Sequence, residues 1–188
     1  MNQSDDDGLT FRAVDADTRG DFETLFSSRG APKYCWCMVW RRTPAEAKHN
    51  DGASRKAQMM ARLDAGTPIG LIAYENGAPL AWVSVAPRDT YRNLGGPPAE
   101  PGEIIWSIAC FYVPRRRRGE GMIYRLIAAA VDHARDRGAT VVEAYPIPGD
   151  APSYRFMGFI SVFARAGFED IGRAGKRRHV MRYRLSPG

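Results

Sequence analysis

The 188-residue chain has few of the residues that form covalent or metal frameworks, with only three cysteines and three histidines. Cys35, Cys37 and Cys110 are too few and too closely spaced for a disulfide framework. Cys35 and Cys37 cannot complete a zinc site alone, and the histidines are scattered without the spacing of metal ligands. We therefore expect no bound metal, and we interpret Cys110, which lies in an apolar run, as a small core residue.

Long apolar runs are also missing. The longest, such as residues 104–113, fall well short of the roughly 20 residues that a membrane-spanning helix needs. The acidic N-terminus lacks the basic-then-apolar pattern of a secretory signal. These absences favour a cytoplasmic protein with no membrane partner. Residues 1–8 are expected to be a disordered lead-in, and residues 9–188 have the length of a single domain.

The net charge of +6 is unevenly distributed along the chain. Residues 1–111 contain 12 Lys and Arg against 14 Asp and Glu, whereas residues 112–188 contain 15 against 7. Such a basic half is typical of a protein that binds a polyanion, either a phosphorylated small molecule or nucleic acid. A merely soluble basic surface explains the distal cluster of Arg173, Lys176, Arg177 and Arg178 equally well.

The most informative segment is 110–122, where an apolar run is followed by an Arg- and Gly-rich turn and then by a predicted helix. A glycine turn that opens a helix directs several backbone N–H groups and the positive end of the helix dipole at one point. Such a point favours a phosphate group. The turn has neither the Lys-Ser/Thr of a P-loop nor the glycine spacing of a dinucleotide site. The alternative interpretation is a solvated basic turn.

The residues after this turn show helical periodicity. Apolar side chains recur at helical spacing from Met122 to Ala134, and Gly138 ends the predicted helix. The β-branched run 140–145 then predicts a strand buried on both faces. A strand, a crossover helix and a second strand form a right-handed parallel unit, with the ligand at the carboxyl ends of the strands.

The rest of the chain predicts further strands and helices. Strands are expected at 9–14, 69–74, 80–86, 103–113, 168–171 and 179–185, and helices at 17–26, 54–65 and 159–166. The dipeptide Asn76-Gly77 predicts a tight hairpin between the second and third strands.

The spacing Arg116-x-x-Gly119-x-Gly121, between a strand and a helix, resembles the pyrophosphate-binding signature of the GNAT superfamily of acyl-CoA N-acyltransferases. The predicted element order is also similar to that family over about residues 9–185. The resemblance implies an α/β (α+β) fold, in which a mixed six- to seven-stranded sheet has helices on both faces and a splayed fourth and fifth strand. It further implies an acyltransferase, either monomeric or homodimeric, with acetyl-CoA as cosubstrate.

In this family the pantetheine arm of acetyl-CoA lies between the splayed strands. The resemblance assigns this arm to the backbone of Phe111 and Val113. It assigns the pyrophosphate to the turn and the start of the helix, namely Arg116, Arg117, Arg118, Gly119, Glu120, Gly121 and Met122. Glycine suits the turn because a Cβ would obstruct the phosphates.

Acyl transfer to an amine needs a base for the amine, polarisation of the thioester carbonyl and an acid for the leaving thiolate. Family members commonly use a glutamate or an ordered water as base, which makes Glu143 and Glu103 the candidates here. Glu143 lies amid an apolar run, where a charge is costly unless it is functional or paired with an arginine. Both interpretations of Glu143 stay open.

The family's usual acid is a tyrosine four residues before the Gly-Phe that begins the sixth strand, but this chain has Phe163 there. Phenylalanine cannot donate a proton. Either Tyr154, Ser161 or Tyr145 substitutes for the missing acid, or the thiolate departs to water without one.

The resemblance places the acceptor pocket beneath the first two helices and their connection, residues 32–50. The expected contacts are in an aromatic and sulfur-rich cluster, namely Tyr34, Cys35, Trp36, Cys37 and Trp40. Most such clusters are core, and Cys35 or Cys37 has a second possible role as a transient acyl-enzyme. Arg41 and Arg42 either engage an acidic acceptor or face water.

The chain is therefore predicted to be an N-acetyltransferase that passes a short acyl group from acetyl-CoA to a small-molecule amine by direct attack. Trp106, Ile108 and Phe111 favour a short acyl chain because of their bulk. Two other functions stay open. A GNAT-fold transferase with an aminoacyl-tRNA donor would bind RNA with steep salt dependence. A degenerate domain would bind acyl-CoA as a regulatory ligand without catalysis.

Overall fold

The computed structural model describes residues 8–186, whose strands form one seven-stranded sheet in the order β1-β2-β3-β4-β5-β7-β6. Within these residues β4 and β5 pair in parallel, and the other neighbouring strands pair antiparallel. The strands are β1 (Leu9–Ala13), β2 (Leu71–Glu75), β3 (Ala78–Pro87), β4 (Ile105–Tyr112), β5 (Val141–Ala144), β6 (Glu169–Ala174) and β7 (Arg178–Arg184). The mixed sheet predicted from the sequence is confirmed.

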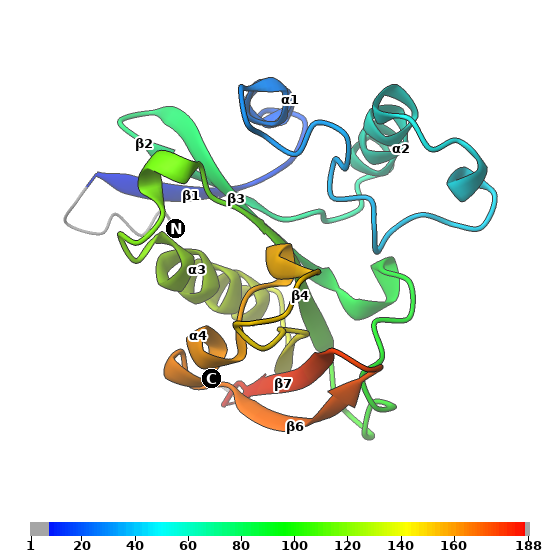
Figure 1. The fold of residues 1–188 in the computed structure, drawn as a ribbon, viewed down its shortest axis with the longest axis vertical. Coiled ribbons are helices and arrows are strands. Elements are labelled where there is room, and N and C mark those ends of the chain that lie inside the picture. Colours follow the sequence, from blue (N-terminus) through cyan, green and yellow to red (C-terminus); the bar gives the residue numbers. More distant parts are fainter. Residues whose placement is uncertain (1–7, 187–188) are drawn as a thin grey trace.

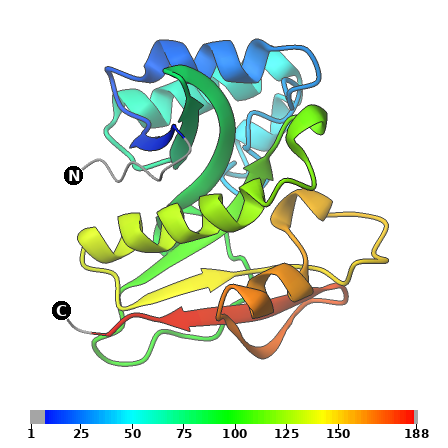
Figure 2. The same cartoon turned by 90° about the vertical axis from the view of Figure 1, so that its left-hand side faces the viewer.

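Helices pack on both faces of this sheet (Figures 1 and 2). One face is covered by α1 (Arg19–Ser27) and α2 (Gly52–Asp64), and the other by α3 (Met122–Asp136) and α4 (Ile160–Arg165). Side chains alternate between the two faces along a strand. Trp82 of β3 therefore packs under α1, whereas its neighbour Val83 packs in the cluster beneath α3.

Two predicted turns and the helix between strands are confirmed in detail. Asn76 and Gly77 both have positive φ, 49° and 79°, as a tight hairpin of this kind requires. The helix predicted from Met122 ends at Asp136, and Gly138 lies just beyond it with a φ of 82°.

The strand β4 extends beyond its parallel partner. Its ladder with β5 ends at the pair of Ile108 and Ala144, whereas β4 continues to Tyr112. The pairing with β3 also shifts at this point, and Ala109 is the extra residue of a bulge. The splayed fourth and fifth strands are therefore confirmed, and one edge of the β4 backbone is left without a strand partner.

Four short 3₁₀ turns complete the described elements: η1 (Glu46–Lys48), η2 (Arg88–Thr90), η3 (Arg115–Arg117) and η4 (Arg155–Met157). Within residues 8–186, no helix is long and apolar enough to cross a membrane. The predicted disordered lead-in over residues 1–8 lies, except for its last residue, outside the described chain.

Candidate active site

A cavity of about 630 Å³ lies at the free end of β4, a volume typical of small-molecule sites. Its wall combines the end of β4, the glycine turn, the start of α3, the segment from η4 into α4, and the α1–α2 connection. The lining residues are Gly30, Pro32, Cys35, Cys110, Phe111, Tyr112, Val113, Arg117, Arg118, Gly119, Gly121, Met122, Ile123, Tyr124, Arg155, Phe156, Gly158, Phe159 and Val162.

Two glycines keep the turn before α3 open. Gly119 and Gly121 have φ values of 85° and 79°, in the left-handed region that glycine adopts at little cost. A Cβ at either position would meet no protein atom within 4 Å. No side chain caps α3, and the N–H groups of residues 119–121 donate to no backbone acceptor in the described chain. Such N–H groups at a helix N-terminus favour an anion.

The arginines of this turn have different contacts. Arg117 Nη2 lies 2.7 Å from Glu75 Oε1, so this side chain is tied to β2. Arg118 Nε donates to the carbonyl oxygen of Val113 at 3.0 Å, which closes the turn, and the side chain also lines the cavity. Arg116 is exposed and lies outside the cavity wall.

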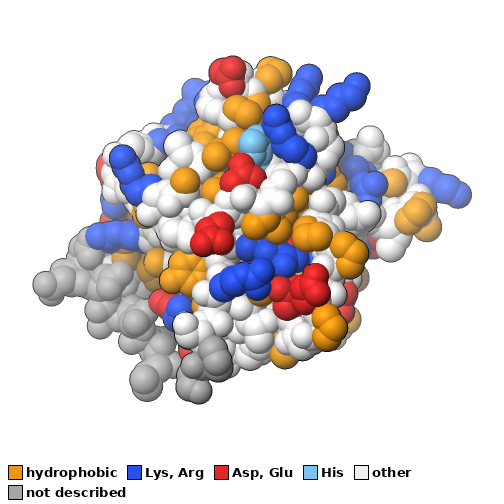
Figure 3. Space-filling view, turned by 90° about the horizontal axis from the view of Figure 1, so that it is seen from below, with side chains coloured by type: hydrophobic (Ala, Val, Ile, Leu, Met, Phe, Trp, Pro, Cys, Tyr) orange, Lys and Arg blue, Asp and Glu red, His pale blue; other side chains and the backbone are white. Residues whose placement is uncertain are grey.

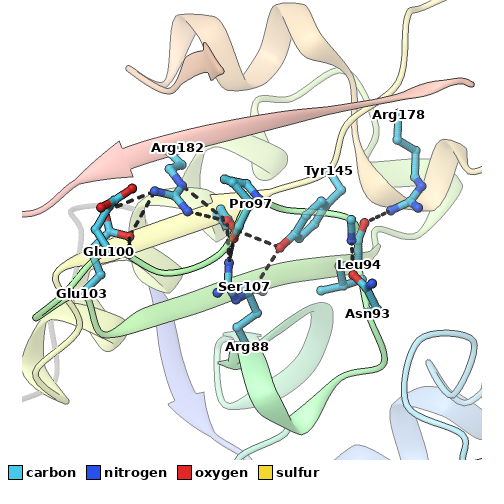
Figure 4. A network of polar contacts seen from close by, with 12 residues as sticks. Arg88, Asn93, Leu94, Pro97, Glu100, Glu103, Ser107, Tyr145, Arg178 and Arg182 are labelled. Carbon is cyan, nitrogen blue, oxygen red and sulfur yellow. Dashed lines mark hydrogen bonds and ion pairs between the residues drawn. The ribbon is translucent and has the colours of Figure 1, made fainter. Parts of the chain in front are cut away.

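A buried ion-pair network lies beside β5 (Figure 4). Glu143 is fully buried, and its carboxylate accepts from Arg88 Nη1 at 3.0 Å and from Arg182 Nη2 at 3.3 Å. Arg182 Nη1 also lies 3.1 Å from Glu103 Oε1. Neither glutamate is among the residues that line the cavity.

Comparison with known proteins identifies the family of this site. The model of the acetyltransferase (GNAT) family matches residues 33–159, which contain most of the cavity wall, from Cys35 in the α1–α2 connection to Phe159 just before α4. The chain belongs to the acetyltransferase (GNAT) family. A search of curated proteins found no match.

Solved structures share the GNAT fold with this chain. An uncharacterized protein from Bacillus halodurans has a TM-score of 0.63 and 18% identity, covering 98% of this chain and 89% of its own. Ribosomal-protein-S5-alanine acetyltransferase from Vibrio fischeri has a TM-score of 0.59 and 11% identity, covering 98% and 96%. The yncA protein of Salmonella typhimurium, solved with its cofactor acetyl-CoA, has a TM-score of 0.57 and 20% identity, covering 96% of both chains.

Seven of the nine residues predicted to hold the cofactor line the cavity at the end of β4, namely Phe111, Val113, Arg117, Arg118, Gly119, Gly121 and Met122. Arg116 and Glu120 are exposed outside its wall, and Glu120 pairs with Arg117. Tyr112 and Tyr124 also line the cavity and were not predicted from the sequence, although Tyr112 lies within the segment 110–122.

The hydroxyl groups predicted to replace the missing acid are dispersed. Tyr145 is fully buried and donates to Glu143 Oε1 at 3.1 Å. Burial, together with this carboxylate, raises the pKa of Tyr145 well above its ordinary value. Ser161 is exposed on α4, and Tyr154, just before η4, is 37% exposed; both lie outside the cavity wall. Phe163, at the family's tyrosine position, is fully buried in the core.

An aromatic and cationic cluster adjoins the cavity on the η4 side. The guanidinium of Arg178 lies 4.3 Å from the ring centre of Trp40 and 5.9 Å from that of Tyr154. Partial burial lowers the pKa of Arg178 below its ordinary value. Phe156, which lines the cavity, lies 6.1 Å from the Tyr154 ring. The predicted contact residue Trp40 lies outside the cavity wall, and its ring centre is 6.1 Å from that of Tyr154.

The other residues predicted to contact the acceptor lie in three different places: on the surface, in the cavity wall and in the core. Tyr34 is 72% exposed, and Cys35 lines the cavity. Trp36 is 4% exposed and stacks on Phe26 with 5.4 Å between ring centres, so of the two interpretations of this cluster the core one holds at Trp36. Cys37 is also buried, and packs in the same apolar cluster.

Two further predictions are corrected by burial. Arg41 neither faces water nor reaches the cavity, because it is 3% exposed and its Nη2 donates to Ser84 Oγ at 3.1 Å. Of the bulky β4 residues expected to limit the acyl chain, Phe111 lines the cavity. Trp106 and Ile108 instead pack in the cluster beneath α3.

Proposed function

We propose that the protein transfers an acetyl group from acetyl-CoA to the amine of a small molecule. The proposal rests on one cavity whose wall includes both the glycine turn at residues 119–121 and the end of β4 that has no strand partner. Acetyl-CoA requires both features, because it joins a pyrophosphate to an extended arm with amide groups. Such an arm adds to a free strand edge by backbone hydrogen bonds.

The residues of the cavity fit this donor. The free N–H groups of residues 119–121 and the Arg118 side chain would hold the pyrophosphate, and the open space before both glycines leaves room for it. The backbone of Phe111 and Val113 would pair with the pantetheine arm. The donor supplies the activated thioester, and the protein supplies its position relative to the amine.

No Asp, Glu or His lines the cavity among the described residues. Glu143 lies outside the cavity wall, and its carboxylate is held by Arg88 and Arg182. We therefore infer that water accepts the proton of the amine, and that the leaving thiolate is protonated from water. Precise placement of the two reactants contributes several kcal/mol, so such a site remains active without an enzymic base.

The acceptor is expected to approach through the cluster of Trp40, Tyr154 and Arg178. Two aromatic rings favour a flat or apolar body, and the guanidinium favours a carboxylate on the acceptor. Arg178 Nη1 donates to the carbonyl oxygen of Leu94, which leaves its other N–H groups for a ligand. We propose an acceptor amine that also has an acidic group.

The basic half of the chain gives less support to an RNA donor. Several of its arginines are neutralised within the fold, including Arg117 with Glu75, and Arg182 and Arg184 with Glu103. On the face shown in Figure 3, Lys and Arg side chains lie among Asp and Glu side chains rather than in one continuous patch.

The test is release of CoA thiol from acetyl-CoA in the presence of a panel of small amines. We expect release with acidic amines and none without an amine. Binding of acetyl-CoA without turnover of any amine would favour a regulatory domain. Gel retardation of tRNA that weakens steeply with salt, without acetyl-CoA binding, would instead favour an aminoacyl-tRNA donor.

A further inference from the structure

Two cysteines far apart in the sequence meet beneath the cavity. Cys37 Sγ, from the α1–α2 connection, lies 2.7 Å from Cys110 Sγ on β4. Both thiols are free and buried, with exposed fractions of 5% and 6%. The separation exceeds a disulfide bond of about 2.05 Å by only about 0.7 Å, so a bond between the sulfurs needs only a small approach.

The backbone around Cys37 has an uncommon conformation that directs its side chain toward β4. Trp36 and Cys37 have φ values of 46° and 53°, in the left-handed region that side chains other than Asn or Asp rarely adopt. Trp82 Nε1 donates to Cys37 Sγ at 3.2 Å. The indole N–H is only a donor, so this sulfur acts as an acceptor. The sulfur of Cys37 is thus fixed from two sides.

A buried cation lies close to this thiol pair. Arg41 is 3% exposed, forms no ion pair with a carboxylate of residues 8–186, and has no hydrogen-bond partner for Nε. It stacks on Tyr91 at 4.1 Å, and its charge interacts with both Cys37 and Cys110. This guanidinium without a carboxylate partner places a buried positive charge beside both sulfurs.

The pair also has a route to solvent. Cys110 lines the proposed donor cavity, so a molecule as small as a peroxide reaches its sulfur. The hydrogen bond with Cys37 and burial hold the pKa of Cys110 well above its ordinary value.

We propose that Cys37 and Cys110 are a redox-active dithiol, which hydrogen peroxide or an organic hydroperoxide closes to an intramolecular disulfide. The thiolate of one cysteine attacks the peroxide O–O bond, forming a sulfenic acid and releasing water or an alcohol. The other thiol attacks this sulfur and forms the S–S bond, and the sulfenic oxygen leaves as water. Two thiols are oxidised, and the peroxide is reduced.

The test uses the full chain, reduced, freed of reductant and treated with hydrogen peroxide. Remaining thiols are alkylated, and the intact mass and proteolytic peptides are measured. We expect loss of two thiols, a peptide pair joined through Cys37 and Cys110, and full recovery with dithiothreitol. The matched control C35S removes the other cavity cysteine and should behave as the wild type. C37S and C110S should form no such link.

Three results would overturn the proposal: a link that includes Cys35, only sulfinic or sulfonic acid, or no thiol loss while free glutathione is oxidised in the same buffer. The wild-type peptide map decides the question even if C37S or C110S fails to fold.

A second arm rests on the proposed function, because bound acetyl-CoA would cover Cys110 and should slow closure of the disulfide. If acetyl-CoA does not slow disulfide formation, the proposed dithiol is unaffected, but the proposed acetyl-CoA site beside Cys110 is contradicted.

Discussion

Glu143 and Arg182 face each other as a register pair between β5 and β7, with Arg182 Nη2 3.3 Å from Glu143 Oε2. Arg88 of η2 approaches the same carboxylate, and Glu103 just before β4 approaches the same guanidinium. Two positive and two negative charges thus join three strands and the connection that follows β3. This arrangement makes Glu143 a residue that holds the sheet together below the cavity.

Glu143→Gln should lower the free energy of unfolding by about 3–5 kcal/mol, because two arginines would lose a buried counter-charge. Urea denaturation measures the change. Glu100→Gln removes an exposed carboxylate nearby and should stay within about 0.5 kcal/mol of the wild type. A variant of full stability that has lost turnover would show instead that Glu143 is the catalytic base.

The ion pair between Glu46 and Arg62 should make the α1–α2 connection sensitive to acid. Arg62 donates to both carboxylate oxygens at 2.8 Å and lowers the pKa of Glu46 from 4.5 to about 2. A carboxylate with a depressed pKa stabilises the fold above its ordinary pKa, and the contribution is lost as pH falls toward the depressed value.

Glu46→Gln should therefore cost about 1–2 kcal/mol at pH 7, and the difference from the wild type should shrink between pH 4.5 and pH 2. Urea denaturation at several pH values measures both stabilities. A difference that stays constant across this range would show that the ion pair does not stabilise the fold.

Arg178→Gln should raise the KM for an acidic amine about tenfold, equivalent to about 1.4 kcal/mol, and leave acetyl-CoA binding unchanged. The neighbouring Arg177→Gln is the control, because Arg177 is exposed and contacts Ser153 rather than the aromatic rings. Steady-state kinetics with the best amine of the panel distinguishes them. Equal KM values for both variants would show that Arg178 does not bind the acceptor.

Local sequence patterns correctly predicted the helix, the turns and the hairpin around the cavity. The apolar periodicity from Met122 gave the helix α3, and the glycines at 119, 121 and 138 occupy the positive-φ positions that bound it. The hairpin at Asn76-Gly77 followed from turn chemistry alone. In each case the physical cause lies within a few neighbouring residues, which a single sequence displays.

Contacts between distant segments could not be predicted in the same way. Cys37 meets Cys110 across 73 positions, and Trp36 enters the core because an irregular connection turns inward there. Glu143 was open to two interpretations, since its arginine partners come from η2 and β7. Only the tertiary packing of loops decides such contacts, and no periodicity marks it.

The proposed function requires acetyl-CoA to bind at the glycine turn before α3. Binding is measured by calorimetric titration of the wild type, Gly119→Ala, Gly121→Ala and Gly138→Ala. All three glycines have positive φ and open space around a Cβ, so the backbone strain is matched, but Gly138 lies at the far end of the helix. We predict one-to-one binding that weakens at least about tenfold in the first two variants and is retained in Gly138→Ala. Equal affinity in all four proteins, or no binding by the wild type, would show that this turn is not an acetyl-CoA site.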